Sequence, residues 1–589
     1  MVKMHGMVEQ SLALSGIRRS CKMRKYLYVA MFIALLSSCS NNVRKEAKEA
    51  LKMQNESAEL SQTEKMFFGY DKKNVYDSSI IIKVKAYNNE DVDTFLASLK
   101  DLNVEYKRRE KGLVEGEMYV FLKALGDYPL TLKKLRAMDE VLYAEPNYKT
   151  KLIDSFGRSR TTNFIDPLSL TTGDLAQDPE ADMKGYSLEI TEALKAYKEF
   201  GYGEHTVWAG IVDSGSNGNH EDLQASDGSV VKILKTAFGG AKETEIVEVT
   251  TGDSDDPNTQ GGHGTHCTGV ICAVGNNGKG IAGVAWKNVK FISYKGLKEG
   301  EGYDESIYGS LRDLVDTVRK QVSQEQQATV PVNLSLGGFM VSSYMVEQIN
   351  YALSKGVLPV VANGNDGQLI ANYPAACPGV LSVGASGDND KKAGFSTYGP
   401  WLNVVAPGLE IISLGHLPVA TYVNMSGTSM ATPFVTGLVA YLLSFDPTLT
   451  PYQIIALLET TADKIDAQNT DPAGMYDENG FSMWYGHGRV NVYKAVKMLK
   501  DGKVPAKGET YVETVLHVNV PSDTPALYVY EKKTGVLVSM NLPNQKVGVK
   551  PKAYYVDIRG LRPGTYNVVF NQKMQEITIG KEKDVEITF

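Results

Sequence analysis

Three residues far apart in the chain have side chains that together suit acyl transfer by a serine nucleophile. Asp213 ends the apolar run VWAGIVD, His263 lies in GGHGTHCTG, and Ser429 lies in SGTSMATP directly before the apolar stretch FVTGLVAYLL. A serine hydroxyl is a weak nucleophile, so it needs a base within hydrogen-bond reach and an acid that orients the base. The chain order acid, base, nucleophile is one in which such a trio is found.

The local sequence around Ser429 predicts a tight turn that opens a buried helix. A helix beginning at Ser429 would direct partial positive charge toward an oxyanion formed there. Pro433 is expected within the first turn of that helix, where its missing N–H is harmless. Each of the three residues also suits a structural role alone, as a turn cap, a core histidine or a helix N-cap. Their joint presence favours catalysis.

Two other chemistries fit the sequence less well. Ser429 lies in G-T-S-M-A rather than in G-x-S-x-G, and the lipase-like arrangement orders its residues Ser, acid, His. His263 and His266 lack the helical i, i+4 spacing and the glutamate of H-E-x-x-H. We therefore expect neither a lipase-like site nor a catalytic metal.

The motifs D-S-G, H-G-T-H and G-T-S-M-A-T-P resemble those of the subtilisin-like (S8) family, over about residues 207 to 496. The resemblance implies a serine endopeptidase that acts on protein or peptide substrates and needs no cofactor for its chemistry. It implies Asp213, His263 and Ser429 as the catalytic triad. Asn365 corresponds to the oxyanion donor of the family, whose loss typically lowers turnover by about 10²–10³.

The resemblance also implies a substrate cleft with two walls. One wall is a strand whose backbone pairs with an extended substrate, and the other borders the specificity pocket. An apolar side chain before the cleaved bond is the expected preference. The residues implied in these walls are Ser335, Leu336 and Gly337 for the strand, and Ala362, Asn363 and Gly364 for the opposite side.

Cys267, which follows His266, resembles the cysteine of the thiol-bearing, proteinase K-like branch of the family. There the thiol packs near the catalytic histidine, so a mercurial is expected to inhibit the enzyme and to spare a Cys267→Ala variant. Cys272 and Cys377 are expected to be small buried hydrophobes. Cys267 and Cys272, five residues apart on one helix, point in different directions and should not pair.

Structural calcium, common in the family, is left open by the sequence. Asp253, Asp255 and Asp256 form an acidic cluster, but a solvated turn is the expected role of their loop. Asn403 stands where relatives commonly carry an aspartate, which weakens one expected site. Calcium needs about six to eight oxygen ligands, and the sequence alone does not assemble them.

Length and composition indicate several ordinary globular domains. The chain has 589 residues, is 43% hydrophobic and 22% charged, and carries a net charge of −7. This mild acidity gives no indication of the basic surface that nucleic-acid binding requires. Five cysteines exclude a disulfide-dense scaffold.

The first 39 residues resemble a bacterial lipoprotein signal. Arg24 and Lys25 precede the apolar run YLYVAMFIALL, and Leu36-Ser37-Ser38 leads to Cys39 as the lipidated residue. The expected location is the bacterial cell envelope, with a lipid anchor in the outer membrane facing the periplasm or the exterior. An uncleaved membrane anchor with an incidental Cys39 is the alternative. Residues 40–76 are polar and charged, as in a tether.

Residues 77–150 are predicted to form a ferredoxin-like α+β domain, because strands and helices follow in the order β-α-β-β-α-β. Its place and its ending VLYAEPNYK resemble the inhibitory propeptides of the family, which assist folding and occupy the cleft of their own enzyme. An independent small domain is the alternative. Residues 151–186 are predicted to be a linker that holds the processing site.

Residues 187–500 alternate apolar strands and helices, which predicts an α/β domain with a parallel, doubly wound sheet. Residues 505–589 are predicted to form a small antiparallel β-sandwich. The leading hypothesis is a self-processing serine endopeptidase made as a zymogen. A catalytically idle subtilase scaffold that binds through its C-terminal domain is the alternative, and an exopeptidase is a third.

Overall fold

The structure is a computed structural model. It describes residues 75–152 without 114, residues 164–165, residues 186–505 with short gaps, and residues 515–589 with short gaps. The predicted signal with Cys39, the tether up to residue 74 and most of the linker lie outside the described residues. The internal gaps are 226–227, 239–245, 250–251, 257–258, 260–261, 417–421, 522–526, 533–536, 542, 546–553, 560, 562–563, 572 and 581–583.

The N-terminal domain has the predicted β-α-β-β-α-β order. Its strands pair in the order β4-β1-β3-β2, and β1 is antiparallel to both of its neighbours. The last strand continues two residues past the predicted limit at residue 150. The elements are β1 Val75–Lys85, α5 Asn89–Ser98, β2 Val104–Lys111, β3 Glu117–Ala124, α6 Tyr128–Arg136 and β4 Val141–Leu152.

The central domain is built on an eight-stranded sheet, in the order β10-β9-β11-β6-β13-β15-β16-β17. All neighbours from β9 to β17 pair in parallel, as the β-branched runs predicted. The short edge strand β10 is antiparallel to β9, so the sheet is mixed. The strands are β6 Val207–Asp213, β9 Val231–Thr236, β10 Val247–Glu248, β11 Val289–Lys295, β13 Val330–Leu334, β15 Val357–Ala362, β16 Leu381–Ser386 and β17 Val404–Pro407.

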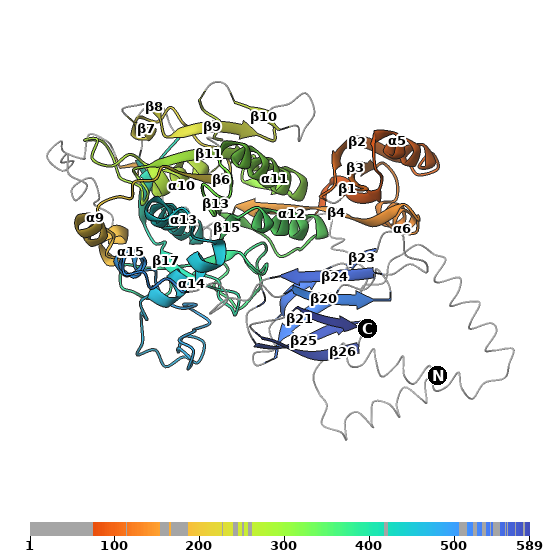
Figure 1. The fold of residues 1–589 in the computed structure, drawn as a ribbon. Coiled ribbons are helices and arrows are strands. Elements are labelled where there is room, and N and C mark those ends of the chain that lie inside the picture. The colour runs from red at the N-terminus through yellow and green to blue at the C-terminus, as the bar shows by residue number, and fades with distance from the viewer. Residues whose placement is uncertain are drawn as a thin grey trace, which may run out of the picture. The chain divides into compact units, whose positions relative to one another are not determined.

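Helices cover both faces of this sheet (Figure 1). Alternate residues of β6 face opposite ways: Val207 and Ile211 pack in the core that holds α10 His263–Cys272 and α13 Thr428–Phe445. Trp208 and Val212 pack on the other side, against α11 Asp304–Gln321 and α12 Ser343–Ser354. Among the described residues, α13 is the single helix long and apolar enough to cross a membrane, and 94% of it is buried inside the protein.

Smaller elements complete this domain. Strands β18 and β19 form a hairpin to which β5 adds. The remaining elements are β5 Phe164–Ile165, α8 Tyr186–Ile190, α9 Ala193–Phe200, the 3₁₀ turn η2 Glu221–Leu223, β7 Gln224–Ala225, β8 Gly228–Ser229, β12 Glu301–Tyr303, β14 Leu336–Gly337, β18 Ile411–Leu414, β19 Tyr422–Met425, α14 Pro451–Thr461 and α15 Val492–Lys500.

The C-terminal region holds two four-stranded sheets, β23-β24-β20-β27 and β22-β21-β25-β26, around an apolar core of their own. An antiparallel sandwich was predicted, but β20 and β27 pair in parallel. The strands are β20 Val515–Val520, β21 Leu527–Glu531, β22 Leu537–Asn541, β23 Asn544–Gln545, β24 Tyr554–Arg559, β25 Gly564–Phe570, β26 Lys573–Ile579 and β27 Val585–Thr588.

Candidate active site

Asp213 is the last residue of β6 and lies at the carboxyl end of the parallel sheet, where ligand sites of such sheets gather. Its side chain is fully buried. The Oδ1 atom lies 2.8 Å from Nδ1 of His263 and accepts a 2.7 Å hydrogen bond from the backbone N–H of Ser214. A buried carboxylate at this distance fixes which imidazole nitrogen carries the proton.

His263 is the first residue of α10 and is 2% exposed. Burial opposes its charged form, but the Asp213 carboxylate, with a smaller contribution from Cys267, raises the pKa of His263 well above its ordinary value. Its Nε2 atom makes no hydrogen bond within the described part of the chain. This nitrogen is therefore the one that is able to receive a proton.

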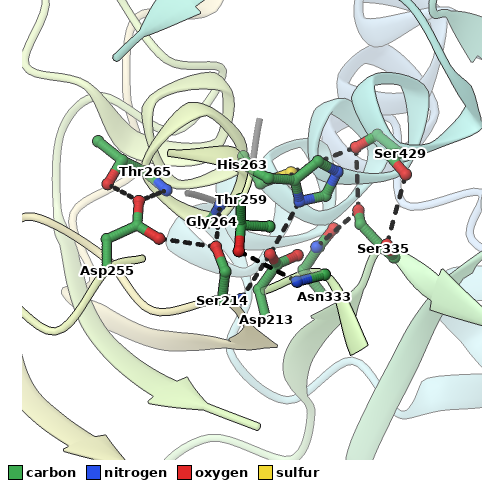
Figure 2. Close-up of polar contacts among 12 residues, drawn as sticks. Asp213, Ser214, Asp255, Thr259, His263, Gly264, Thr265, Asn333, Ser335 and Ser429 are labelled. Carbon is green, nitrogen blue, oxygen red and sulfur yellow. Dashed lines mark hydrogen bonds and ion pairs between the residues drawn. The ribbon is translucent and has the colours of Figure 1, made fainter. Parts of the chain in front are cut away.

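Ser429 is the second residue of α13, because the helix begins one residue earlier than predicted, at Thr428. Figure 2 shows the His263 ring between the side chains of Asp213 and Ser429. The Ser429 hydroxyl donates a 3.3 Å hydrogen bond to the backbone oxygen of Ser335. In this state the proton of the candidate nucleophile is thus directed to a backbone carbonyl.

Pro433 does not lie in the first turn of α13, as the sequence predicted, but in the helix interior. A proline lacks the N–H that would bond the carbonyl four residues earlier, which here is the carbonyl of Ser429. Two other groups bond this oxygen instead: the Ser335 hydroxyl at 2.9 Å and the Cys267 thiol at 3.4 Å. The proline therefore makes the Ser429 backbone available to two neighbouring segments.

Asn365 lies beside the start of α13 and is 3% exposed. Its carboxamide oxygen accepts hydrogen bonds from the backbone N–H and the hydroxyl of Thr428, both 2.9 Å long. Its Nδ2 lies so close to Gly427 that a Cβ there would come within 3.1 Å. The Ser429 N–H, in the first turn, is among those without an acceptor inside the helix. The same Cβ on Gly427 would lie 3.5 Å from the Ser429 nitrogen, so both N–H groups lie close to Gly427.

Strand β4 of the N-terminal domain pairs with β14, which is part of the expected substrate-binding strand, and with β12, which was not expected at the cleft. It is antiparallel to β14, where Leu336 faces Leu152 and Gly337 faces Lys151, and antiparallel to β12 on its other edge. The backbone N–H of Leu152 donates a 3.0 Å hydrogen bond to the carbonyl of Gly300. An extended segment of the chain itself therefore takes the backbone contacts that a substrate strand would take.

The opposite wall agrees in part with the expectation. Ala362 ends β15, and Gly364 has a left-handed φ of +109°, where a Cβ would lie 2.7 Å from Nδ2 of Asn372. The side chain of Asn363 is fully buried and serves the scaffold. It bonds the Thr397 carbonyl, the Ser382 hydroxyl and the Trp401 indole. The Asn363 side chain is therefore not available to a substrate, which is able to contact only its backbone.

Cys267 lies on α10 one turn after His263, as the resemblance implied. Its sulfur is 3.9 Å from Nδ1 of His263, and burial raises the pKa of the thiol. Asp213, His263 and Cys267 each have a potential metal-ligand atom, and these three atoms lie within 4.8 Å of one another. Two atoms of this group, Asp213 Oδ1 and His263 Nδ1, are joined by a hydrogen bond. The three described cysteines, Cys267, Cys272 and Cys377, are buried and unbridged. Mercurial sensitivity stays a prediction.

The acidic loop is not the solvated turn that the sequence predicted. Asp255 and Asp256 are 8% and 4% exposed, and Asp253 lies 3.1 Å from the His416 ring. Asp255 accepts hydrogen bonds from Ser214 and Thr265, and Asp256 accepts one from the backbone of Glu299. Asn403 is also buried and bonds Glu459 and Ser382. These carboxylates are used to join backbone segments.

The structure brings the predicted residues Asp213, His263, Ser429, Asn365 and Ser335 to one place. Sequence reasoning assigned no role to two residues that support them. Ser214 bonds both Asp255 and the start of α10, and Asn333 donates a 2.9 Å hydrogen bond to the Ser335 hydroxyl. The sequence signal that could have identified them is position: Ser214 directly follows Asp213, and Asn333 lies near the end of β13.

The sequence of the chain is similar to those of known proteins. A model of the Subtilase family, peptidase S8, matches residues 204–488. Thermitase from Thermoactinomyces vulgaris is 37% identical over 288 residues, which make up 49% of this chain and 87% of thermitase. A thermophilic serine proteinase from Bacillus sp. (strain AK1) is 30% identical over 395 residues, 67% of this chain and 80% of that protein.

The fold is similar to that of a solved structure as well. Fervidolysin from Fervidobacterium pennivorans, described as a keratinolytic enzyme related to subtilisin, aligns with a TM-score of 0.62 at 22% identity. The match covers 88% of this chain and 79% of fervidolysin. At that identity the likeness concerns the fold. The extensive match to thermitase, together with the family model, shows that this chain belongs to the subtilase family and is a subtilisin-like serine endopeptidase.

Proposed function

We propose that the chain hydrolyses peptide bonds with Ser429 as nucleophile, His263 as general base and Asp213 as the orienting acid. The observation that carries this proposal is the 2.8 Å contact between Asp213 Oδ1 and His263 Nδ1, which leaves Nε2 to act on the substrate side. Ser429 Oγ attacks the carbonyl carbon, and its proton moves to His263 Nε2. His263 then protonates the leaving amine, which departs and leaves the acyl group bonded to Ser429 Oγ. Water gives a proton to His263 and attacks this acyl carbon; the bond to Ser429 Oγ breaks, and His263 returns the proton to the serine.

The developing oxyanion is proposed to receive hydrogen bonds from Nδ2 of Asn365 and the backbone N–H of Ser429. Thr428 holds the Asn365 oxygen with two hydrogen bonds, so the amide is oriented before the substrate arrives. Donors fixed in advance need no reorganisation during the reaction. Ser429 supplies the nucleophile and one oxyanion donor, His263 the base and Asn365 the second donor, so we propose that the chemistry needs no cofactor. Structural calcium remains a separate proposal, tested by the effect of a chelator on the melting temperature.

The N-terminal domain, residues 75–152, is proposed to act as the intramolecular inhibitor. Its strand β4 pairs with β14, part of the expected substrate-binding strand, and with β12 on its other edge, so a substrate strand is excluded while it is bound. Partly buried ion pairs join the two domains: Lys83 Nζ lies 2.8 Å from Glu347, and Arg108 Nε lies 2.5 Å from Glu305. Because partly desolvated, hydrogen-bonded charges require matched partners, these pairs favour this docking position.

The register of β4 predicts where the chain cuts itself. Lys151 faces Gly337 and Leu152 faces Leu336, so the next position in this order corresponds to Ser335, whose carbonyl bonds the Ser429 hydroxyl. We therefore expect cleavage of the bond after Ile153. Within the predicted linker, residues 153–163 and 166–185 lie outside the described residues.

Self-processing is tested by expressing the full chain with and without Ser429→Ala. The proposal expects the unmodified chain to give a mature form whose N-terminus is Asp154, and the variant to remain uncut. Processing of the variant at the same bond, in a host whose own proteases do not cleave that bond, would contradict self-processing. A mature N-terminus upstream of Ser78 would contradict the inhibitor role.

The protein is further proposed to be a lipoprotein of the bacterial cell envelope, anchored through Cys39. The sequence that supports this is the basic and apolar run that ends at Leu36-Ser37-Ser38-Cys39. Mass spectrometry of the N-terminal peptide is expected to show an acylated Cys39. A Cys39→Ala chain found in the membrane fraction to the same extent as the unmodified chain would contradict the anchor.

A further inference from the structure

Helix α10, which carries His263 as its first residue, is capped by groups outside the helix. Its N-cap residue is a glycine and offers no side chain. The first N–H groups of a helix have no acceptor within it, so they need partners elsewhere. Three separate acceptors serve them: the Thr259 carbonyl bonds the N–H of His263 at 3.1 Å, the Ser214 hydroxyl bonds that of Gly264 at 2.9 Å, and the Asp255 carboxylate bonds that of Thr265 at 3.0 Å.

Asp255 joins the start of α10 to the end of strand β6, which carries Asp213. Its Oδ2 accepts both the backbone N–H and the hydroxyl of Thr265, two residues after His263. Its Oδ1 accepts a 2.6 Å hydrogen bond from the hydroxyl of Ser214, the residue directly after Asp213. Figure 2 shows the carboxylate between these two side chains. One carboxylate therefore holds the end of β6 against the start of α10.

The surroundings make this link rigid. Asp255 is 8% exposed, and its Oδ1 also accepts a 2.7 Å hydrogen bond from the backbone N–H of Asp256. Ser214 bonds Asp255 as donor and Gly264 as acceptor, so its hydroxyl is fixed at both ends. The two segments are also in close contact, since a Cβ on Gly264 would lie 1.9 Å from the carbonyl oxygen of Gly215.

We propose that Asp255 is a positioning residue for the reaction, which keeps His263 and Asp213 at their hydrogen-bond distance by clamping the two elements that carry them. This inference rests on the proposed function of the triad. Displacement of a catalytic group by about 1 Å lowers turnover by about 10²-fold, even when the altered residue does not touch the substrate. Asp255 acts in this way through Ser214 and Thr265, without reaching the reacting atoms.

The test compares Asp255→Asn with Asp256→Asn in the full chain after processing. Asparagine has the size of aspartate, but its NH2 would face a hydrogen-bond donor at one of the two contacts. Asp256 is the matched control, because it is the adjacent buried aspartate and its Oδ2 accepts a 2.5 Å hydrogen bond from the backbone N–H of Glu299. Rates are normalised to the sites that a fluorophosphonate labels.

For Asp255→Asn we expect kcat to fall at least tenfold with KM within twofold, and for Asp256→Asn we expect kcat to stay within threefold of the unmodified enzyme. The downfield proton resonance of the His263 Nδ1–H should shift or broaden in the first variant alone. Combining Asp255→Asn with Ser214→Ala should lower kcat by less than the product of the single effects, because both changes break one link.

If Asp255→Asn does not accumulate as a folded protein, Ser214→Ala is measured in its place. We expect the same fall in kcat, again with KM nearly unchanged. An unchanged kcat in these variants, or an equal loss in Asp256→Asn, would overturn the positioning role. The proposed function fails separately, if the unmodified mature enzyme itself is not labelled by the fluorophosphonate.

Discussion

Ser335 and Ser429 are joined by two hydrogen bonds that run in opposite directions. The Ser335 hydroxyl donates to the Ser429 carbonyl at 2.9 Å, and the Ser429 hydroxyl donates to the Ser335 carbonyl at 3.3 Å. The first bond replaces the helix bond that Pro433 removes, and the second must break when Ser429 gives its proton to His263. A bond of 3.3 Å is long for a hydroxyl donor, so its loss during the reaction costs little.

Replacing Ser335 by alanine should therefore slow the enzyme by loosening the backbone at Ser429. A net hydrogen bond is worth about 0.5–1.5 kcal/mol, so we expect kcat to fall by about 2- to 12-fold. The matched control is Ser310→Ala, since Ser310 is also buried and its hydroxyl makes no hydrogen bond within the described part of the chain. Equal effects of the two substitutions on kcat would contradict this role of Ser335.

The activity of the mature enzyme should rise with pH through the pKa of His263. Burial favours the neutral ring, but Asp213 outweighs it and raises this pKa well above its ordinary value. The protonated ring does not accept the Ser429 proton, so the active fraction grows as pH exceeds the raised pKa. We expect kcat/KM to increase as pH rises above 6.5, the ordinary pKa of histidine. A profile that is flat or falls above that pH would contradict the assignment.

The docked inhibitory domain should become less stable as pH rises above about 5. Burial raises the pKa of Glu145 to about 7, although this carboxyl accepts hydrogen bonds from the backbone N–H groups of Ser343 and Tyr344 at the start of α12. The folded zymogen thus binds a proton that the unfolded chain releases near pH 4.5. Stability falls between pH 4.5 and 7, by about 3 kcal/mol for this group, and levels off above pH 7.

This pH dependence is measured by urea unfolding of the uncut Ser429→Ala chain at pH 5 and pH 8. Adding Glu145→Gln keeps a hydrogen-bond acceptor at this position but removes the titrating proton. The double variant should lose less stability than the parent between the two pH values. An identical loss in both would show that another group carries the effect.

A basic side chain should be preferred at the substrate position that Lys151 occupies in the inhibitory strand. Glu301, on β12, lies 2.8 Å from Lys151 and 3.7 Å from Lys149. These groups are about half exposed, and such pairs contribute about 0.2–1 kcal/mol, so the expected preference for Lys over Ala is about 1.4- to 5-fold in kcat/KM. The preference should weaken with salt and vanish in Glu301→Gln. Equal cleavage of both peptides by the unmodified enzyme at low salt would contradict it.

Much of the site was predictable because it follows from strand ends and turns. Asp213 lies at the carboxyl end of β6, as the apolar run VWAGIVD indicated, and a parallel sheet brings such ends together. Ser429 lies in the first turn of a buried helix, within one residue of the start that its motif indicated. The order of elements in residues 75–152 also followed from their periodicity.

The remaining features depend on contacts between distant residues, which a single sequence does not reveal. Asp255 was expected in a solvated turn, but its partners Ser214 and Thr265 make it a buried link. Pro433 was misplaced because the helix starts one residue earlier and the missing bond falls on Ser429. Strand β4 extends to Leu152 because β12 and β14, which come from a distant part of the chain, supply its hydrogen bonds.

The most direct test of the central claim is covalent labelling of Ser429 with a fluorophosphonate in the mature protein. The account predicts a phosphonylated peptide that contains GTSMATP, with the adduct on Ser429, and at least a roughly 10³-fold slower labelling in His263→Ala, which lacks the base. Mature protein that is folded but remains unlabelled, or is labelled at another serine while still cleaving peptides, would contradict catalysis by Ser429.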